Sequence, residues 1–183
     1  MAGRLFVISG ASGVGKSTVL GKVMKDNPNL RFSVSATTRA PRPGETHGVE
    51  YYFITKEQFR EMIGNNAFVE YDAHMDNYYG TPTDQLEEKL QTGDVILDIE
   101  PVGAFNVRSV RPDATLIFIA PPSMEELERR LRGRGDTSEE QMQLRLARAR
   151  WEMEQSEKYD HVVINEQVDA CAEEILKIIA EKA

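Results

Sequence analysis

A glycine-rich segment near the N-terminus combines residue types that bind phosphate. Residues 10–17 read Gly-Ala-Ser-Gly-Val-Gly-Lys-Ser, which is the spacing Gly-x-x-x-x-Gly-Lys-Ser. The glycines let the backbone curl so that its N–H groups point inward, and a following helix adds its positive N-terminal end. Lys16 is expected to reach the outer phosphates of a nucleotide, and Ser17 to ligate Mg²⁺. An apolar run before the loop and a helical pattern after it favour a nucleotide site over a glycine turn without a ligand.

A second basic segment could hold another phosphate. Arg39 and Arg42 lie three apart in a loop that Pro41 and Pro43 stiffen. Each guanidinium can grip a phosphate through two hydrogen bonds, and the prolines reduce the entropy lost on ordering. Seen alone, the segment is as compatible with a solvated basic loop. Beside an intact phosphate loop, it favours a donor nucleotide and a phosphorylated acceptor on one chain.

The elements that position these residues alternate between strand and helix patterns. Apolar runs predict strands, and capping signals at Thr55/Gln58, Ser123/Glu126 and Ser138/Gln141 open three of the helices. Residues 37–48 are rich in Pro, Gly, Arg and Thr and predict a loop. The expected strands cover residues 5–9, 31–35, 51–54, 68–73, 78–81, 94–99, 115–120 and 162–164. The expected helices cover residues 17–25, 55–65, 84–91, 103–110, 123–132, 138–157 and 168–182.

This alternation predicts an α/β fold with a central parallel sheet flanked by helices. Ligands of such sheets bind at the carboxyl ends of the strands, so the phosphate loop and Asp98–Glu100 are expected to meet there. Two residues apart on a strand, Asp98 and Glu100 face one side. They could serve a Mg²⁺ shell, a ribose hydroxyl or the acceptor arginines, and an acid–base pair for hydrolysis is the less favoured alternative.

Composition excludes several classes of protein. The chain has 183 residues and a formal net charge of −8, which argues against general binding to nucleic-acid backbones. It contains neither an apolar stretch of membrane-span length nor an N-terminal signal segment. The one cysteine, Cys171, excludes an internal disulfide, fits the apolar face of a helix, and predicts a cytoplasmic protein. The three histidines have no spaced partner, so no metal site is expected on them.

Eight motifs together make the chain resemble the guanylate kinases, a family of P-loop nucleoside monophosphate kinases. Two of them, TTRxPRxGE and NYYGT, are specific to that family, whereas the phosphate loop is not. One departure is the segment Glu100-Pro101-Val102, where the family usually has Asp first and Gln third. The motifs are GASGVGKST (10–18), SATTRAPRPGE (35–45), GVEYYF (48–53), FVEY (68–71), NYYGT (77–81), LDIE (97–100), RLRGRG (130–135) and VIN (163–165).

The resemblance implies a P-loop kinase fold over a single domain of residues 1–183. The implied core covers about 1–34 and 82–183, an inserted mixed α+β lobe for GMP covers about 35–81, and a mobile lid covers about 130–145. In the lobe, Arg39, Arg42, Tyr51 and Tyr79 correspond to groups that hold the GMP phosphate, and Ser35, Glu70 and Thr81 to groups that read guanine. Glu45, Asp98 and Glu100 complete the implied GMP-binding set.

The resemblance also implies the donor site and the reaction, ATP + GMP → ADP + GDP. Lys16 and the arginines Arg130, Arg134 and Arg145 correspond to catalytic groups that clamp the transferring phosphate, and Ser17 to the Mg²⁺ ligand. A GMP phosphate oxygen is already ionised, so no general base is needed and catalysis is expected from positioning and charge neutralisation. The implied ATP-binding residues are Gly10, Ala11, Ser12, Gly13, Val14, Gly15, Lys16, Ser17, Thr18 and Asn165.

Alternative functions remain open from the sequence. Some domains of this kind are scaffolds for phosphorylated peptides, but those usually have a degraded phosphate loop. Two further alternatives are a nucleotide kinase for another base and a GTPase-like switch. A switch would not explain the Arg39 and Arg42 loop. The expected partners are therefore ATP and GMP, with Mg²⁺, and without nucleic acid, membrane or an obligate protein partner.

Overall fold

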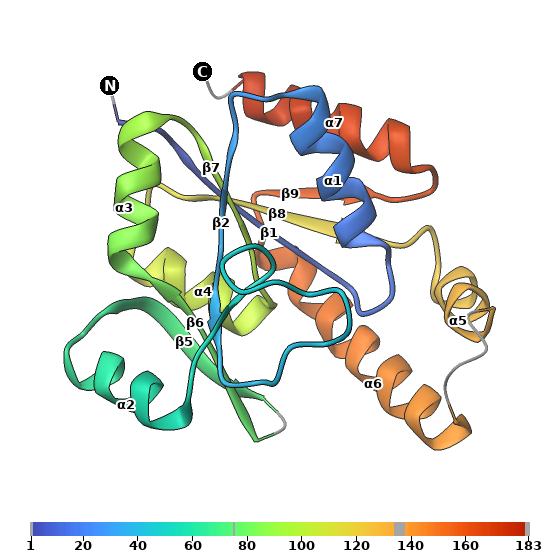
Figure 1. The fold of residues 1–183 in the computed structure, drawn as a ribbon. Coiled ribbons are helices and arrows are strands. Elements are labelled where there is room, and N and C mark those ends of the chain that lie inside the picture. The colour runs from blue at the N-terminus through green and yellow to red at the C-terminus, as the bar shows by residue number, and fades with distance from the viewer. Residues whose placement is uncertain (1, 75, 134–137, 182–183) are drawn as a thin grey trace. The chain divides into compact units, whose positions relative to one another are not determined.

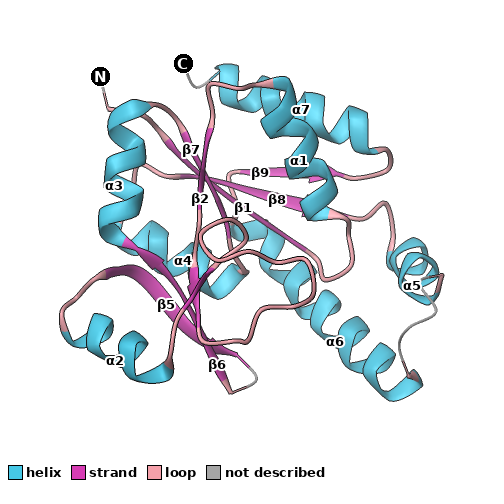
Figure 2. Cartoon of the chain, in the orientation of Figure 1, coloured by secondary structure: helices cyan, strands magenta, loops and turns pink. Residues whose placement is uncertain are grey.

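The strands of the chain form two sheets (Figures 1 and 2). The computed structural model describes residues 2–74, 76–133 and 138–181. A five-stranded sheet has the order β2-β7-β1-β8-β9, and a four-stranded sheet has the order β4-β3-β6-β5. The pairs β2/β7 and β8/β9 are parallel, whereas the smaller sheet mixes parallel and antiparallel pairs. The predicted fold, a central parallel sheet flanked by helices, is confirmed.

The chain divides into two compact units. The first unit contains Met1–Phe6 and Asn29–Ala114, and the second contains Val7–Pro28 and Thr115–Ala183. Strand β1 (Leu5–Gly10) contributes residues to both. The segment that we expect to bind GMP, residues 35–81, lies wholly within the first unit.

Among its described residues, the first unit contains three helices and most of the strands. Its hairpin of β5 and β6 is antiparallel, with a register shift between Phe68 and Glu70 and with Glu70 opposite Thr81. The ring of Phe59, from α2, stacks on those of Phe68 and Tyr78 and anchors the helix to this hairpin. The elements are β2 (Arg31–Ser33), β3 (Ala36–Thr37), β4 (Tyr52–Phe53), α2 (Lys56–Gly64), β5 (Phe68–His74), β6 (Asn77–Pro82), α3 (Thr83–Thr92), β7 (Val95–Asp98) and α4 (Pro101–Val110).

Two local predictions in the first unit were wrong. The loop predicted from residue 37 overlaps a short strand, β3, which pairs with β4 and β6. Helix α4 begins at Pro101 rather than at Gly103. Proline is well suited to the first helical position because its missing N–H has no partner there and its fixed φ fits a helix. Glu100 therefore becomes the N-cap residue of α4.

The second unit contains the remaining helices and two parallel strands. Helices α1 and α7 lie side by side (Figure 1). Cys171 is buried on α7, which confirms its predicted packing role. None of the helices within the described ranges could cross a membrane. The elements are α1 (Lys16–Asp26), β8 (Thr115–Ala120), α5 (Met124–Arg132), α6 (Glu139–Gln155), the 3-10 helix η1 (Ser156–Lys158), β9 (His161–Ile164) and α7 (Val168–Glu181).

The three predicted helix caps are present, although only one is reciprocal. Thr55 and Gln58 form a complete capping box at α2. Ser138 accepts a hydrogen bond from the N–H of Gln141 at α6, and Ser123 accepts one from the N–H of Glu126 at α5. The Glu126 carboxylate does not return to the cap, because it binds the guanidinium groups of Arg129 and Arg130 instead.

Candidate active site

The phosphate loop has the backbone conformation that its glycines predict. Gly13 and Gly15 have φ angles of 85° and 93°, in the left-handed region that favours glycine. The N–H of Ala11 donates to the Ile119 carbonyl, and that of Val14 donates back to Ala11. Within the described residues, the N–H groups of Gly13 and Gly15 donate to no protein acceptor. The loop therefore leaves backbone donors for an anion, next to the start of α1.

Lys16 and Ser17 are the first two residues of α1, as the motif predicts. The N-cap residue, Gly15, has no side chain to cap the helix. The first N–H groups of a helix have no intrahelical acceptor, and the helix dipole adds partial positive charge there. The sequence has thus placed an ammonium group and a hydroxyl group at an end of a helix that already favours anions.

Asn165 lies against this loop, and Arg130 binds Asn165, all within the second unit. The Asn165 amide donates 2.8 Å to the carbonyl oxygen of Val14, and its side chain is buried. Arg130 donates to the Asn165 carbonyl at 2.8 Å, and its Nε donates to Glu126 at 2.7 Å. Glu126 also binds Arg129. Arg129, followed by Arg130, lowers the pKa of Glu126 to about 2. The structure therefore brings together Asn165 and Arg130, two residues that we expect in the ATP site, beside the phosphate loop.

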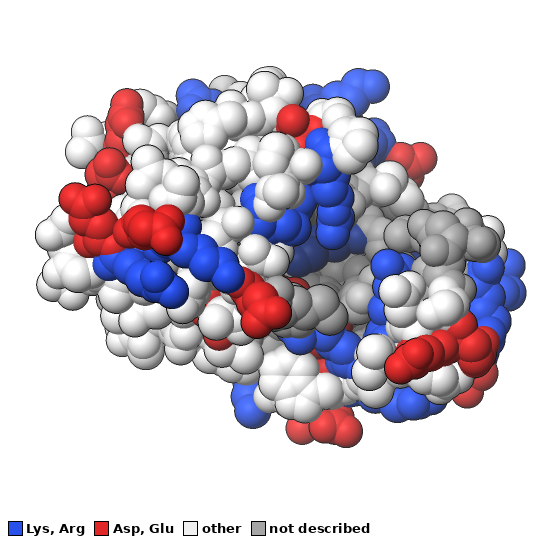
Figure 3. Space-filling view, turned by 60° about the horizontal axis from the view of Figure 1, so that its bottom comes forward, with Lys and Arg blue, Asp and Glu red and all other residues white. Residues whose placement is uncertain are grey.

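Of the two other predicted arginines, the structure describes only Arg145. Arg145 is exposed on α6, and it makes no hydrogen bond or ion pair within the described ranges. Arg134 lies outside the residues that the structure describes. The neighbouring arginines of α5 are paired with acids, since Arg129 binds Glu126 and Arg132 binds Glu139. Figure 3 shows the same mixing of basic and acidic side chains over the surface that it presents.

The expected acceptor arginine, Arg39, is held by Glu45. Two guanidinium nitrogens donate to the Glu45 carboxylate at 2.9 and 2.8 Å, and the Arg42 N–H donates to it at 2.7 Å. The Arg39 guanidinium, followed by the Arg42 N–H, lowers the pKa of Glu45 to about 2. This pairing fixes the direction of the Arg39 guanidinium within the first unit.

Aromatic rings complete the surroundings of Arg39. Its guanidinium carbon lies 5.5 Å from the ring centroid of Tyr51 and 5.7 Å from that of Phe53. The rings of Tyr51 and Tyr79 are 6.0 Å apart in an edge arrangement. Burial, with a smaller contribution from the Asp98 charge, raises the pKa of Tyr51. Arg39, Glu45, Tyr51, Tyr79 and Asp98 therefore form one cluster.

Glu70 and Thr81 form a buried pair on the β5–β6 hairpin. The Thr81 hydroxyl donates to the Glu70 carboxylate at 2.7 Å, and both residues are buried. Burial raises the pKa of Glu70 to about 7, and the hydrogen bond from Thr81 opposes that rise. A bulge directly before Glu70 is a common way to redirect a strand side chain. The result is a carboxylate placed where charge is costly unless a ligand supplies donors.

Ser35 and Glu100 are also in the first unit. Ser35 is buried directly before β3, and its backbone carbonyl accepts from the N–H of Tyr52. Glu100 is exposed at the start of α4, where its side chain makes no capping hydrogen bond. Asp98 lies near Tyr51, and Glu100 is the N-cap residue of α4. Neither position decides between the expected roles of the two carboxylates and the less favoured acid–base pair.

One residue that contacts the phosphate loop was not predicted from the sequence. Glu152 on α6 is buried and accepts a hydrogen bond from the backbone N–H of Ser12 at 2.7 Å. A signal was present: Met142, Leu146 and Ala149 mark the buried face of α6, and Glu152 continues their spacing. A charged residue in an apolar stripe is seldom buried without a partner.

Comparisons with known proteins agree with this geometry. The family model described as guanylate kinase matches residues 2–182. A guanylate kinase of Synechococcus sp. (strain JA-3-3Ab) is 47% identical over 174 residues, covering 94% of this chain and 80% of the relative. These matches extend over nearly the whole chain, so they include both the phosphate loop and the Glu70 region.

Solved structures give the same result at two levels. A crystal structure of guanylate kinase from Anaplasma phagocytophilum has a TM-score of 0.81 and 35% identity, covering 99% of this chain and 86% of that chain. A shikimate kinase from Bacteroides thetaiotaomicron has a TM-score of 0.52 and 12% identity, covering 97% and 98%, and shows similarity of fold alone. The phosphate loop, the family match over residues 2–182 and these relatives show that the chain belongs to the guanylate kinase family.

Proposed function

We propose that the residues described above carry out the reaction of this family, transfer of the γ-phosphoryl group of ATP to GMP. The phosphate loop would bind ATP, the Arg39 cluster would bind the GMP phosphate, and Glu70 with Thr81 would read guanine. The observation that supports the assignment is the buried Glu70–Thr81 pair, since a buried carboxylate can accept from the N–H groups of a base and would repel a phosphate.

On the donor side, Lys16 and the N–H groups of Gly13 and Gly15 would bind the outer phosphates of ATP. The Ser17 hydroxyl would hold Mg²⁺, because Mg²⁺ prefers oxygen ligands and is usually completed by nucleotide phosphates and water. Within the described residues no cluster of three or more His, Cys, Asp or Glu could hold a metal. Bound there, Mg²⁺ would neutralise charge on the phosphates.

On the acceptor side, Arg39 and Arg42 would bind the phosphate of GMP. Glu45 fixes Arg39 before a ligand arrives, so less rotamer entropy is lost on binding. The hydroxyl groups of Tyr51 and Tyr79 would add hydrogen-bond donors. A GMP phosphate oxygen then needs no base, and Lys16 with Arg130, Arg134 and Arg145 would stabilise charge on the group in transfer.

Guanine recognition would depend on the charge state of Glu70. The ionised carboxylate can accept from both the N1–H and the 2-amino group of guanine. Adenine has a lone pair at N1 and no 2-amino group, so it would leave a buried carboxylate unpaired. A mismatch of this kind costs several kcal/mol. The buried Ser35 hydroxyl would donate to the guanine O6. The Thr81 hydroxyl donates to Glu70 in the structure, so it would have to turn away from Glu70 to donate to O6 as well.

An acceptor panel tests the proposal directly. ADP formation from ATP would be measured with GMP, AMP, CMP and UMP as acceptors, at matched concentrations and with Mg²⁺ present. We expect GMP to exceed each of the others by at least 100-fold in kcat/KM. Equal rates with GMP and AMP would exclude the guanine-reading role of Glu70, and ADP formation without any acceptor would exclude a monophosphate kinase.

The nucleotide substrates and the single buried cysteine fit a cytoplasmic protein.

A further inference from the structure

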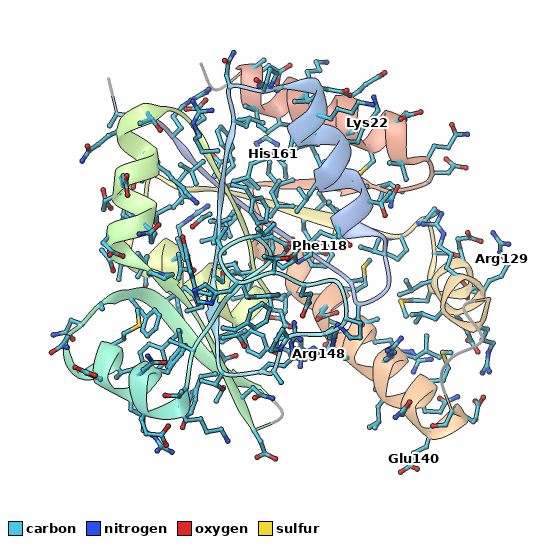
Figure 4. The ribbon with its side chains drawn as sticks, viewed as in Figure 1. Lys22, Phe118, Arg129, Glu140, Arg148 and His161 are labelled. Atoms are coloured by element: carbon cyan, nitrogen blue, oxygen red, sulfur yellow. The ribbon has the colours of Figure 1, made fainter. Side chains whose placement is uncertain are left out.

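A buried carboxylate on α6 holds the phosphate loop by its backbone. The Glu152 side chain is 3% exposed, and its Oε2 accepts the Ser12 N–H at 2.7 Å. Its Oε1 accepts from the Nε of Arg148, one turn earlier on α6, at 3.1 Å. In Figure 4, Arg148 lies on the C-terminal half of α6, while Glu140 projects outward from the first turn of the same helix. A buried charge with both partners in place is stable, and the loss of either is costly.

The contact divides the donors of the loop into two sets. The N–H groups of Ala11, Ser12 and Val14 bind protein acceptors, namely Ile119, Glu152 and Ala11. Those of Gly13 and Gly15 bind none within the described ranges. Glu152 therefore occupies a donor at the entrance of the loop and leaves the later donors for an anion. It also fixes the Ala11–Ser12 peptide group, one residue before Gly13.

The same contact ties the loop to the helix that carries Arg145. Glu152 follows Arg145 by seven residues, so the two lie on nearly the same face of α6, about 10 Å apart along its axis. Helix α6 is continuous from Glu139 to Gln155. A shift or rotation of α6 against the loop would therefore displace Arg145 from the position that it needs.

We propose that Glu152 is a positioning residue for phosphoryl transfer, which holds the Ser12 peptide and sets α6, with Arg145, in register with the phosphate loop. The inference rests on the proposed roles of the loop and of Arg145. Glu152 acts through its side-chain carboxylate, which accepts the Ser12 N–H, and touches no substrate. A misplacement of about 1 Å at such a contact can cost about 100-fold in rate.

Three variants separate the acceptor from the charge. Glu152→Ala removes both, whereas Glu152→Gln keeps an oxygen that can accept the Ser12 N–H. Glu154→Ala removes an exposed carboxylate two residues later and serves as the matched control. Steady-state kcat, the KM of ATP and the dissociation constant of GMP would be measured for each. We expect E152A to lower kcat at least tenfold, E152Q to stay within threefold of the parent protein, and E154A to match it. All should bind GMP with unchanged affinity, since GMP would bind the first unit.

Amide hydrogen exchange of the unaltered protein supplies a test that needs no variant. The Ser12 amide should exchange slowly without nucleotide, and those of Gly13 and Gly15 quickly until an ATP analogue is added. In E152A, if it folds, the protection of Ser12 should be lost, and in E152Q it should persist.

Several results would overturn the inference. They are Ser12 exchange as fast as that of Gly13 in the unaltered protein, kcat unchanged in E152A, or E152Q as slow as E152A. Arg145→Ala, assayed in parallel, distinguishes the proposed role of Arg145 from the positioning role of Glu152. A fully active R145A would remove the proposed role of Arg145 itself, whereas a slow R145A beside a fully active E152A would remove only the positioning role of Glu152.

Discussion

The phosphate loop of the second unit and the Glu70 region of the first unit would bind the two substrates of one reaction by different means. The Glu70 region is the buried pair of Glu70 and Thr81 on the β5–β6 hairpin. The loop is one short run of chain whose donors are backbone N–H groups, shaped by Gly13 and Gly15. The Glu70 region uses side chains from separate strands, and its central group is a buried carboxylate. A backbone site depends on local conformation, whereas a side-chain site depends on the identity of each residue.

The contrast explains why the two regions should respond differently to substitution. Any triphosphate can satisfy a ring of N–H donors, so the loop is expected to contribute rate and affinity with little choice of base. A buried carboxylate rejects a base that leaves it unpaired, so Glu70 is expected to contribute choice. Substitutions confined to one region should therefore leave the other nucleotide unaffected.

The largest effect is expected at Lys16. Lys16→Ala removes the positive charge that would stabilise the transferring phosphoryl group, and we expect kcat to fall by about 100- to 1,000-fold. GMP affinity, measured by calorimetry, should not change. Lys22→Ala is the control, because Lys22 lies on the same helix and forms a surface ion pair with Asp26. A K16A protein that had lost GMP binding would contradict the separation of the two regions.

Glu70→Gln should cause the next largest effect. The substitution keeps the shape of the side chain but exchanges one acceptor oxygen for a donor, so the ratio of kcat/KM for GMP over AMP should fall about 100-fold. Initial rates with each acceptor at saturating ATP give the ratio. Glu61→Gln, on the exposed face of α2, is the matched control. A ratio that stays as in the parent protein would show that guanine is read elsewhere.

The pH dependence of GMP binding should follow Glu70. Burial raises its pKa to about 7, so its proton is bound at pH 6 and released by pH 8. Since only the ionised carboxylate accepts from both guanine donors, GMP affinity should rise up to about tenfold between these pH values. The phosphate of GMP titrates near pH 6 as well. Measuring E70Q across the same range isolates the Glu70 contribution, and identical profiles for the two proteins would disprove it.

Gly103→Ala should give a smaller, selective effect. A Cβ at Gly103 would lie 2.9 Å from Oε2 of Glu70, so the carboxylate must move by a few tenths of an ångström. We expect the KM of GMP to rise about fivefold, since such an off-rotamer shift costs about 1 kcal/mol. The KM of ATP should not change. Gly64→Ala, where a Cβ would meet nothing within 4 Å, is the control. Thermal unfolding should show no loss in G103A, because alanine favours a helix.

The difference between the regions also limits what the sequence could predict. The phosphate loop follows from eight consecutive residues, and the structure confirms its strand, its turn and its helix. Strand and helix types were mostly correct for the same reason, since apolar periodicity and caps are local signals. Helix α4 was placed two residues late because Pro101 at its first position was not used as a start signal.

Other features depend on contacts between distant residues, which spacing does not encode. The Glu70–Thr81 pair requires the register of a hairpin that contains a bulge. The bidentate Arg39–Glu45 pair requires the fold of a loop with two prolines. Glu152 could have been noticed as a charge in the apolar stripe of α6, but its partner, the Ser12 N–H, lies 140 residues away in the chain.

One experiment tests the separation of the two regions most directly. Isothermal titration calorimetry would give the dissociation constants of GMP and of a non-hydrolysable ATP analogue for the parent protein, K16A and E70Q. We predict that E70Q weakens GMP binding at least tenfold and leaves the analogue unchanged, while K16A leaves GMP unchanged. If E70Q weakened both nucleotides equally, or if K16A weakened GMP as strongly as E70Q does, the assignment of donor and acceptor to different regions would be contradicted.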